Sequence, residues 1–408
     1  MRGAACGLAI GLLLSSCGGD STTGHSTQLT IVVNAPFSQS PYVGRTIYQG
    51  TKLAVDKINA AGGAQIGSDT YTFKVVKLDN ALSPQRALQN VRTAVADQAV
   101  AIVDEGTGVL STWQVANAAH IPLGVVYQGG EGIIDPQKRP NLFRIAPTDH
   151  GIAFRLAEYL IPKGLKVAFI HDDSDYGQQG AIAFDDAWGS SPKAVATQIS
   201  VPSDATDLSA QVLQARRSGA TALLVWAHSS TVAAVIRAAR SAGWDAPVYT
   251  APSGEDPLVR QQLSDHPDWV DGLTFAAGRM TSEKGPANFL AFEKAYEAAF
   301  GPDEVGVKTA SGQPVIAPPD YAMYPYDFVN VLVAAMKAAH TPRGASVVST
   351  MNQVDVLGAN GDERSFNEKN HDGVVDDDVY FATFHDMTYA PVKDDPLSST
   401  LPKLPQTR

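Results

Sequence analysis

Four short polar segments of the sequence carry the side chains best suited to binding chemistry. They combine hydroxyl, amide, carboxylate, phenol and imidazole groups, which form directed hydrogen bonds to small polar molecules. Each follows a short apolar run that predicts a buried strand, and each alone would equally fit an ordinary strand-to-helix turn. Because such turns gather at one edge of an open α/β sheet, where ligands bind, their recurrence predicts a binding cleft. The segments are residues 104–108, 127–131, 171–177 and 228–230.

The sequence lacks the patterns that common catalytic sites require. It contains no Gly-x-Ser-x-Gly, Gly-x-x-x-x-Gly-Lys or His-Glu-x-x-His pattern. Its nine histidines are scattered singly, and its two cysteines, Cys6 and Cys17, both lie at the N-terminus. Gly106 and Gly108 lack the third glycine of a dinucleotide fingerprint. We therefore expect a protein that is not an enzyme, with no cofactor and no metal site.

Residues 368–376 resemble part of a calcium-binding loop. Oxygen-bearing residues stand at positions 1, 3, 5 and 9 of the loop, and Gly373 stands at position 6. Position 12 is Val379 instead of the usual glutamate, and a strand is expected to follow. We therefore interpret the segment as a polar turn.

Length and composition point to a large globular protein. The chain has 408 residues, 44% of them hydrophobic, which suffices for two or three packed domains. Its formal net charge of −11 disfavours contact with phosphate backbones, so we expect no nucleic-acid partner.

Predicted strands and helices alternate through most of the chain. This order predicts an α/β fold with two doubly wound, Rossmann-like lobes, each a mainly parallel sheet covered by helices on both faces. The expected strands are residues 29–33, 71–78, 100–103, 123–126, 167–170, 195–200, 223–226, 248–250, 273–276 and 379–384. The expected helices are residues 48–61, 84–97, 111–119, 149–160, 178–188, 208–218, 231–242, 289–300, 326–339 and 345–351.

The N-terminus has the features of an export signal. An apolar run at residues 8–14 is too short to span a bilayer. The sequence Leu14-Ser15-Ser16-Cys17 resembles a bacterial lipobox, which implies that residues 1–16 are removed and that Cys17 carries a lipid anchor. The alternative is an ordinary signal peptide with a chance cysteine. Residues 17–27 would then form a flexible tether, and we expect residues 391–408 to be a loose tail.

Several segments, in order, resemble bacterial solute-binding proteins of the leucine/isoleucine/valine type. The most specific is the run 54–63, and the resemblance extends over about residues 29–384. The other matching segments are Tyr42-Val43-Gly44, residues 50–53, Leu78-Asp79 with residues 84–87, Ile170-His171-Asp172 with Tyr176-Gly177, residues 236–243, and Tyr326-Asp327.

The resemblance implies a clamshell of two lobes joined by three hinge crossings, the type I periplasmic-binding-protein fold. We place the crossings near Ala146, Ala276 and residues 351–364. Lobe 1 would comprise residues 28–146 plus 277–351, and lobe 2 residues 147–276 plus 352–390. The resemblance implies a protein that delivers a small solute to the membrane subunits of an ABC permease. Together with the lipobox-like sequence, this leads us to expect an exported, lipid-anchored monomer.

The resemblance also implies which residues meet the solute. Thr107 occupies the place of a hydroxyl that binds the ligand carboxylate. Gln128, Gly129 and Gly130 lie where the family's backbone groups and a threonine hydroxyl meet the ligand. Gly130 has no such hydroxyl.

In the second lobe, Tyr176 matches a tyrosine that closes over the ligand, and His228 replaces another tyrosine. Members of the family bind the ligand ammonium with an acidic residue. In this sequence Glu255 lies near that position and matches it only after a shift in register. Glu105 or Glu131 are the alternatives for that role.

The sequence leaves the solute open. An amino acid, an amide, a urea-like compound and a small aromatic or aliphatic acid all fit these departures from the family pattern. A free-standing ligand sensor with the same fold is the alternative function, and an enzyme is a remote one.

Overall fold

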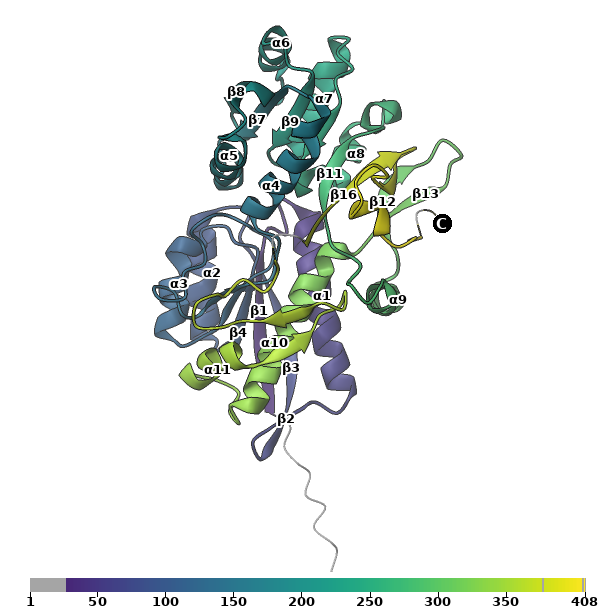
Figure 1. Cartoon of the computed structure of the whole chain (residues 1–408). Helices are drawn as coiled ribbons and strands as arrows, with labels where there is room; N and C mark the ends of the chain where they lie inside the picture. The colour runs from purple at the N-terminus through teal and green to yellow at the C-terminus, as the bar shows by residue number, and fades with distance from the viewer. Residues whose placement is uncertain (1–26, 376–377, 406, 408) are drawn as a thin grey trace, which may run out of the picture.

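The computed structural model describes residues 27–375, 378–405 and 407, and it places two α/β lobes one above the other (Figure 1). Lobe 1 is built on a six-stranded sheet of order β2-β3-β1-β4-β5-β6. Its strands are β1 (Thr27–Ala35), β2 (Ala64–Ile66), β3 (Asp69–Asp79), β4 (Ala101–Asp104), β5 (Leu123–Val125) and β6 (Leu142–Arg144). Its helices are α1 (Pro41–Ala60), α2 (Pro84–Ala96), α3 (Val109–Ala118), α9 (Ala287–Phe300), α10 (Met323–Ala338) and α11 (Ala345–Thr350).

Lobe 2 is built on a seven-stranded sheet of order β17-β16-β11-β10-β9-β7-β8. Its strands are β7 (Val167–Asp172), β8 (Val195–Val201), β9 (Ala222–Trp226), β10 (Val248–Thr250), β11 (Thr274–Gly278), β16 (Val379–His385) and β17 (Thr388–Pro391). Its helices are α4 (Asp149–Leu160), α5 (Asp175–Trp188), α6 (Ser209–Arg217), α7 (Ser229–Ser241) and α8 (Pro257–Gln262). Short 3-10 turns are η1 (Ile161–Lys163), η2 (Pro192–Ala194), η3 (Pro252–Gly254), η4 (Pro267–Val270), η5 (Asp320–Ala322), η6 (Met351–Gln353) and η8 (Ser398–Thr400).

The central strands of both sheets are buried because they are apolar on both faces. Every residue of β4, β7 and β9 is buried, and these strands pair in parallel with their neighbours. Helices cover both faces, as parallel sheets require. This confirms the predicted α/β fold with two doubly wound lobes.

The longest helix, α1, shows how local sequence sets an element. Pro41 stands at its first position, where a missing N–H costs nothing, and the chain leaves the helix through Gly62 and Gly63 with φ near +90°. Between these ends, Val43, Ile47 and Leu53 face the core, and the helix packs against α10. The start of α1 therefore has a fixed place beside the gap between the lobes.

The chain passes between the lobes after β6 and after β11, and it enters lobe 2 again at β16. The expected third crossing at residues 351–364 is wrong. That segment contains the hairpin of β14 (Asp355–Leu357) and β15 (Glu363–Ser365), which packs against α10 of lobe 1. The return to lobe 2 therefore comes at Asp378 and Val379.

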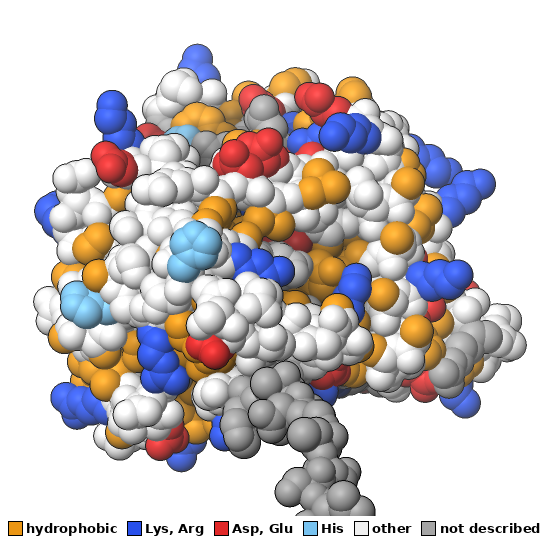
Figure 2. Space-filling model, turned by 90° about the horizontal axis from the view of Figure 1, so that it is seen from below, with side chains coloured by type: hydrophobic (Ala, Val, Ile, Leu, Met, Phe, Trp, Pro, Cys, Tyr) orange, Lys and Arg blue, Asp and Glu red, His pale blue; other side chains and the backbone are white. Residues whose placement is uncertain are grey.

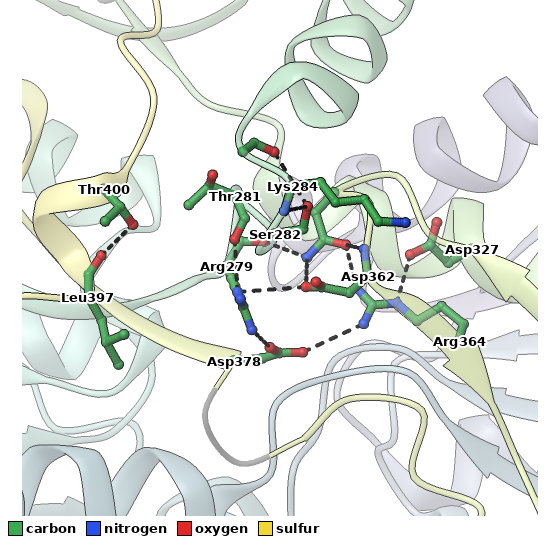
Figure 3. Close-up of polar contacts among 12 residues, drawn as sticks. Arg279, Thr281, Ser282, Lys284, Asp327, Asp362, Arg364, Asp378, Leu397 and Thr400 are labelled. Carbon is green, nitrogen blue, oxygen red and sulfur yellow. Dashed lines mark hydrogen bonds and ion pairs between the residues drawn. The ribbon is translucent and has the colours of Figure 1, made fainter.

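An ion-pair network holds the second and third crossings together (Figure 3). Arg279 follows β11 and donates to Asp378, which precedes β16, at 2.9 Å. Arg364 of β15 donates to Asp327 of α10 at 3.0 Å and lies 3.6 Å from Asp378. Since Arg364, Asp327 and Asp378 are buried, both crossings are anchored to lobe 1 by charges that cannot separate without large cost.

A second hairpin reaches from lobe 1 to lobe 2. Strands β12 (Asp303–Lys308) and β13 (Pro314–Ala317) lie between α9 and α10 in the sequence but pack against α8 and β17. The sequence indicated only a polar stretch here, so residues 277–351 do not all belong to lobe 1.

The expected loose tail is also wrong for the residues that the structure describes. Val392, Leu401 and Leu404 are buried, and the Ser398 hydroxyl accepts a hydrogen bond from the Phe381 N–H at 2.7 Å. Arg155 of α4 donates to both carboxylate oxygens of Asp395, at 3.0 and 3.1 Å. The segment is therefore part of lobe 2.

The face of the molecule that is seen from below mixes charged and apolar groups (Figure 2). Figure 2 shows Lys and Arg side chains around the lower face of the molecule, with Asp and Glu among them and apolar side chains between. Within the described residues, no helix combines the length and apolar character needed to cross a membrane. The expected leader, most of the tether and Cys17 lie outside the described residues.

Candidate functional site

A cavity of about 290 Å³ lies between the two lobes. Its walls come from the segments after β1, β3, β4 and β5 on lobe 1 and from those after β7, β8, β9 and β10 on lobe 2. The lining residues are Pro36, Gln39, Ser40, Val43, Leu82, Glu105, Tyr127 and Gln128 of lobe 1, and Ser174, Tyr176, Ser203, His228, Ser229, Ser230, Ser253 and Leu258 of lobe 2. The carboxyl ends of two sheets therefore face a single cavity, as open α/β sheets allow.

Glu105 is the charged group of the lobe 1 wall. One carboxylate oxygen, Oε1, accepts a hydrogen bond from Gln128 Nε2 at 3.1 Å. The other, Oε2, accepts from the Thr107 N–H at 3.1 Å and from Asn80 Nδ2 at 3.3 Å. Glu105 is only 3% exposed, so these neutral donors hold a buried carboxylate in one orientation.

Gln128 connects the two loops of this wall. Its backbone N–H donates to the Glu105 carbonyl at 3.0 Å, and its amide also lies 3.4 Å from the Thr107 hydroxyl. The turn between them needs Gly106, because φ there is +125° and a Cβ would stand 2.5 Å from the Gln128 Cβ. The expected residues Thr107 and Gln128 are thus in contact, with Gln128 on the cavity wall and Thr107 behind it.

A buried carboxyl group supports this wall from below. Asp104, the last residue of β4, accepts from Asn34 Nδ2 at 2.8 Å and from the Gly106 N–H at 2.7 Å. Burial raises the pKa of Asp104 to about 7, although the Asn34 hydrogen bond opposes the shift. The Gly106 turn is therefore held by Asp104 on one side and packed against Gln128 on the other.

Tyr176 and His228 form the aromatic part of the lobe 2 wall. Their ring centroids lie 5.8 Å apart, and Tyr176 also packs against Trp226 at 6.2 Å. Tyr176 belongs to the first turn of α5, and His228 directly precedes α7. The structure therefore brings together two of the three residues expected in this lobe.

Asp172 orients the lobe 2 wall, a role that sequence reasoning missed. It is fully buried and accepts from the His228 N–H at 2.7 Å, while its other oxygen accepts from the Ser174 hydroxyl. Ser174 in turn caps α5 by accepting from the Gly177 N–H at 3.2 Å. One carboxylate thus orients the starts of α5 and α7. The sequence signal was its place at the end of an apolar strand.

Glu255 does not line the cavity. It is 2% exposed and lies beside Asp320, and burial raises the pKa of Glu255 well above its usual range. Burial likewise raises the pKa of Asp320 to about 7. These two carboxyl groups therefore share a buried site near the end of β11, where the Gly278 N–H donates to Asp320 at 3.2 Å.

Gly129 and Gly130 lie at the first crossing and are absent from the cavity wall in the described structure. The Gly129 carbonyl accepts from the Asp149 N–H at 2.9 Å, and the Gly130 carbonyl accepts from Arg144 Nη1 at 3.0 Å. Glu131, the next residue, is exposed. The Gly129 carbonyl therefore holds the start of α4, and the Gly130 carbonyl holds the end of β6.

The segment expected to be a polar turn, residues 368–376, is described up to residue 375. Asp372 forms an ion pair with Arg144, and its N–H donates to Asn370 Oδ1 at 2.9 Å. Among the described residues, no cluster of three or more histidine, cysteine or acidic side chains is arranged to hold a metal ion.

Comparison with known proteins decides the family. The family model described as periplasmic binding protein matches residues 29–388. The chain belongs to the periplasmic binding protein family. This confirms the resemblance predicted from the sequence, and membership implies a protein exported to the periplasm.

Two relatives of this periplasmic binding protein carry names that refer to amino acids. "Leu/Ile/Val-binding protein homolog 8" of Brucella abortus is 25% identical over 279 residues, which are 64% of this chain and 66% of that protein's own length. The "Amino acid binding protein" of Pseudomonas aeruginosa is 24% identical over 347 residues, 81% of this chain and 83% of that protein. Both are named as binding proteins and not as enzymes.

Solved structures show the same fold. The periplasmic binding protein type 1 of Bordetella pertussis superposes with a TM-score of 0.75 at 20% identity, covering 88% of this chain and 96% of that one. The branched-chain amino acid transporter substrate-binding protein LivJ of Streptococcus pneumoniae, in complex with isoleucine, gives a TM-score of 0.73 at 22% identity, covering 89% and 98%.

Proposed function

We propose that this periplasmic binding protein captures a small polar solute between its lobes and delivers it to an ABC permease. The observation that carries the proposal is the cavity itself, which both lobes line with oriented polar groups. Glu105 and Gln128 would contact the solute from lobe 1, with Thr107 holding them in place. Tyr176 and His228 would contact it from lobe 2. The names of the relatives support a solute of amino-acid size.

The mechanism that we propose is a shift between open and closed forms. A solute that touches both walls makes its full set of contacts only in the closed form, so it favours closure by that difference. The crossings after β6, after β11 and before β16 would serve as the hinge. The permease would then distinguish loaded from empty protein by its shape.

We also propose that the protein acts as a lipid-anchored monomer. The lipobox-like sequence that ends at Cys17 supports acylation there, and the polar residues after it supply a tether. Acyl chains would hold the protein at the membrane surface, close to the permease.

The test is a thermal-shift screen against amino acids, amides, ureas and small aromatic or aliphatic acids. A solute at 100 times its dissociation constant adds about 2.7 kcal/mol to the free energy of unfolding, which corresponds to several degrees in Tm. Tyr176→Ala should weaken binding of that solute about tenfold by removing aromatic contact, whereas Tyr176→Phe should change it little.

Calorimetry on both variants measures the effect. Equal affinity of the wild type and Tyr176→Ala for the solute would remove the lobe 2 wall from the site and contradict capture between the lobes.

A further inference from the structure

We propose that the solute carries a protonated amine that pairs with Glu105, and that any acceptor group of the solute faces lobe 2. This inference rests on the proposed function, because it concerns the same cavity. It reverses the orientation that the family resemblance implies, in which the turn of lobe 1 receives the ligand carboxylate.

The charge of the cavity wall favours a cationic group beside lobe 1. Among the described residues that line the cavity, Glu105 is the single carboxylate, and Lys and Arg are absent. A ligand carboxylate placed against the lobe 1 wall would meet a like charge. A cationic group there would instead receive the partner that a buried charge requires.

The hydrogen bonds of Glu105 leave its carboxylate without a counterion. All three donors that hold it are neutral, and in the described part of the chain no ion pair involves it. A carboxylate offers about four acceptor positions, shared between its two oxygens. Oε1 accepts one hydrogen bond, from Gln128. An acceptor position therefore remains on the oxygen that Gln128 orients. A buried carboxylate without a counterion is costly, and a bound ammonium would offset that cost.

The other acidic candidates are occupied or displaced. Glu255 lies beside Asp320, outside the cavity lining. Glu131 is exposed, and Asp256 caps α8 by accepting from the Leu258 N–H at 2.8 Å. This leaves Glu105 as the group that selects an amine.

The lobe 2 wall offers hydrogen-bond donors to the cavity. Ser174 and His228 begin α5 and α7, whose N-termini carry partial positive charge. Ser253 is 6% exposed and lines the cavity, and its hydroxyl lies near Tyr176 without a well-directed hydrogen bond among the described residues. These donors suit a carbonyl or carboxylate oxygen, but none is a fixed cation. The amine should therefore contribute more to affinity than the acidic group.

The experiment compares matched compounds on the full-length protein at pH 7.5. The probes are leucine, phenylalanine and glutamine, each with its α-amide and with the acid of the same skeleton that lacks the amine. Calorimetry should show that an amino acid and its amide bind, and that loss of the amine weakens binding about 30-fold or more. Conversion of the carboxylate to an amide should change the dissociation constant less than tenfold.

The matched variants are Glu105→Gln and Glu131→Gln. The first should weaken binding of the amine-bearing probe about 30-fold, and the second, an exposed carboxylate, should leave it unchanged. Thermal unfolding of the free variants reports whether Glu105→Gln is folded. The comparison of amine-bearing and amine-free compounds uses the wild-type protein and does not depend on the folding of Glu105→Gln.

Two results would overturn the inference while leaving solute capture intact. One is that an acid without an amine binds as tightly as its amine-bearing counterpart and still depends on Tyr176. The other is unchanged affinity of a folded Glu105→Gln protein for its amine-bearing probe.

Discussion

The two walls of the cavity are built in different ways. On lobe 1, Glu105 and Gln128 are buried and bonded to each other and to Thr107, so their geometry does not depend on a solute. On lobe 2, Tyr176 and His228 are half-buried and stand at helix starts that Asp172 sets. A local network therefore preorganises the lobe 1 wall, whereas the lobe 2 wall depends on a single buried carboxylate behind it.

Removal of the Asp172 carboxylate should have the largest effect on stability. Asp172→Ala deletes the acceptor for the His228 N–H and for Ser174, and it leaves these groups without a partner at a buried site. We expect a loss of about 3 kcal/mol in the free energy of unfolding, measured by urea denaturation. Asp175→Ala, an exposed first-turn residue of α5, is the control and should cost less than about 1 kcal/mol. Equal midpoints for the two variants would show that Asp172 does not organise lobe 2.

The corresponding change on lobe 1 should be smaller, because its network has several members. Gln128→Ala removes one of three hydrogen bonds to Glu105, and the Thr107 N–H and Asn80 remain. We expect a loss of about 2 kcal/mol in the free energy of unfolding. Gln39→Ala, also on the lobe 1 wall, serves as the control. A loss larger than that of Asp172→Ala would invert the comparison.

The smallest expected effect is one of pH. Burial raises the pKa of Asp104 and of Asp320 to about 7, from a usual value of 3.8. The folded state then binds more protons than the unfolded state between about pH 4 and pH 7, so the stability that these groups supply is lost as the pH rises through this window. Asp173, at the lobe 2 rim, has a lowered pKa through the Ser203 N–H and acts only at lower pH.

Thermal unfolding at pH 5 and pH 8 measures this. Asp320→Asn should reduce the loss between the two values by on the order of 1 kcal/mol, because the amide stays neutral at both. An identical pH dependence in the wild type and in Asp320→Asn would exclude Asp320 as the source.

Much of the fold could be predicted from the sequence because it depends on local patterns. The apolar runs that became β4, β7 and β9 and the Gly62-Gly63 helix end lie where periodicity placed them. The lobe on which each polar hairpin packs could not be predicted in the same way. β14–β15 and β12–β13 are short, and the lobe on which each packs is decided by tertiary contacts with α10 or with α8 and β17.

The cavity was predictable to a similar degree. Polar turns after strands indicated Gln128, Tyr176 and His228, because strand ends meet at one sheet edge. The contact between Glu105 and Gln128 depends on the parallel register of β4 and β5, which places Asp104 opposite Val125. The displacement of Glu255 depends on Asp320, which is 65 residues away in the chain and carries no local signal.

The packed segment after β17 has a consequence for the order in which the protein acquires its structure. The first strands of lobe 2 are made early, but β16, β17 and the residues around Ser398 complete its sheet and cover its edge. Lobe 1 has all six strands of its sheet once residue 144 has been synthesised. The lobe 2 sheet is complete only after some 250 further residues have been synthesised. Its completion depends on pairing between strands far apart in the sequence, and such long-range contacts form slowly. A chain that stopped before Val379 would therefore leave β11 as an unpaired edge, open to association with other chains.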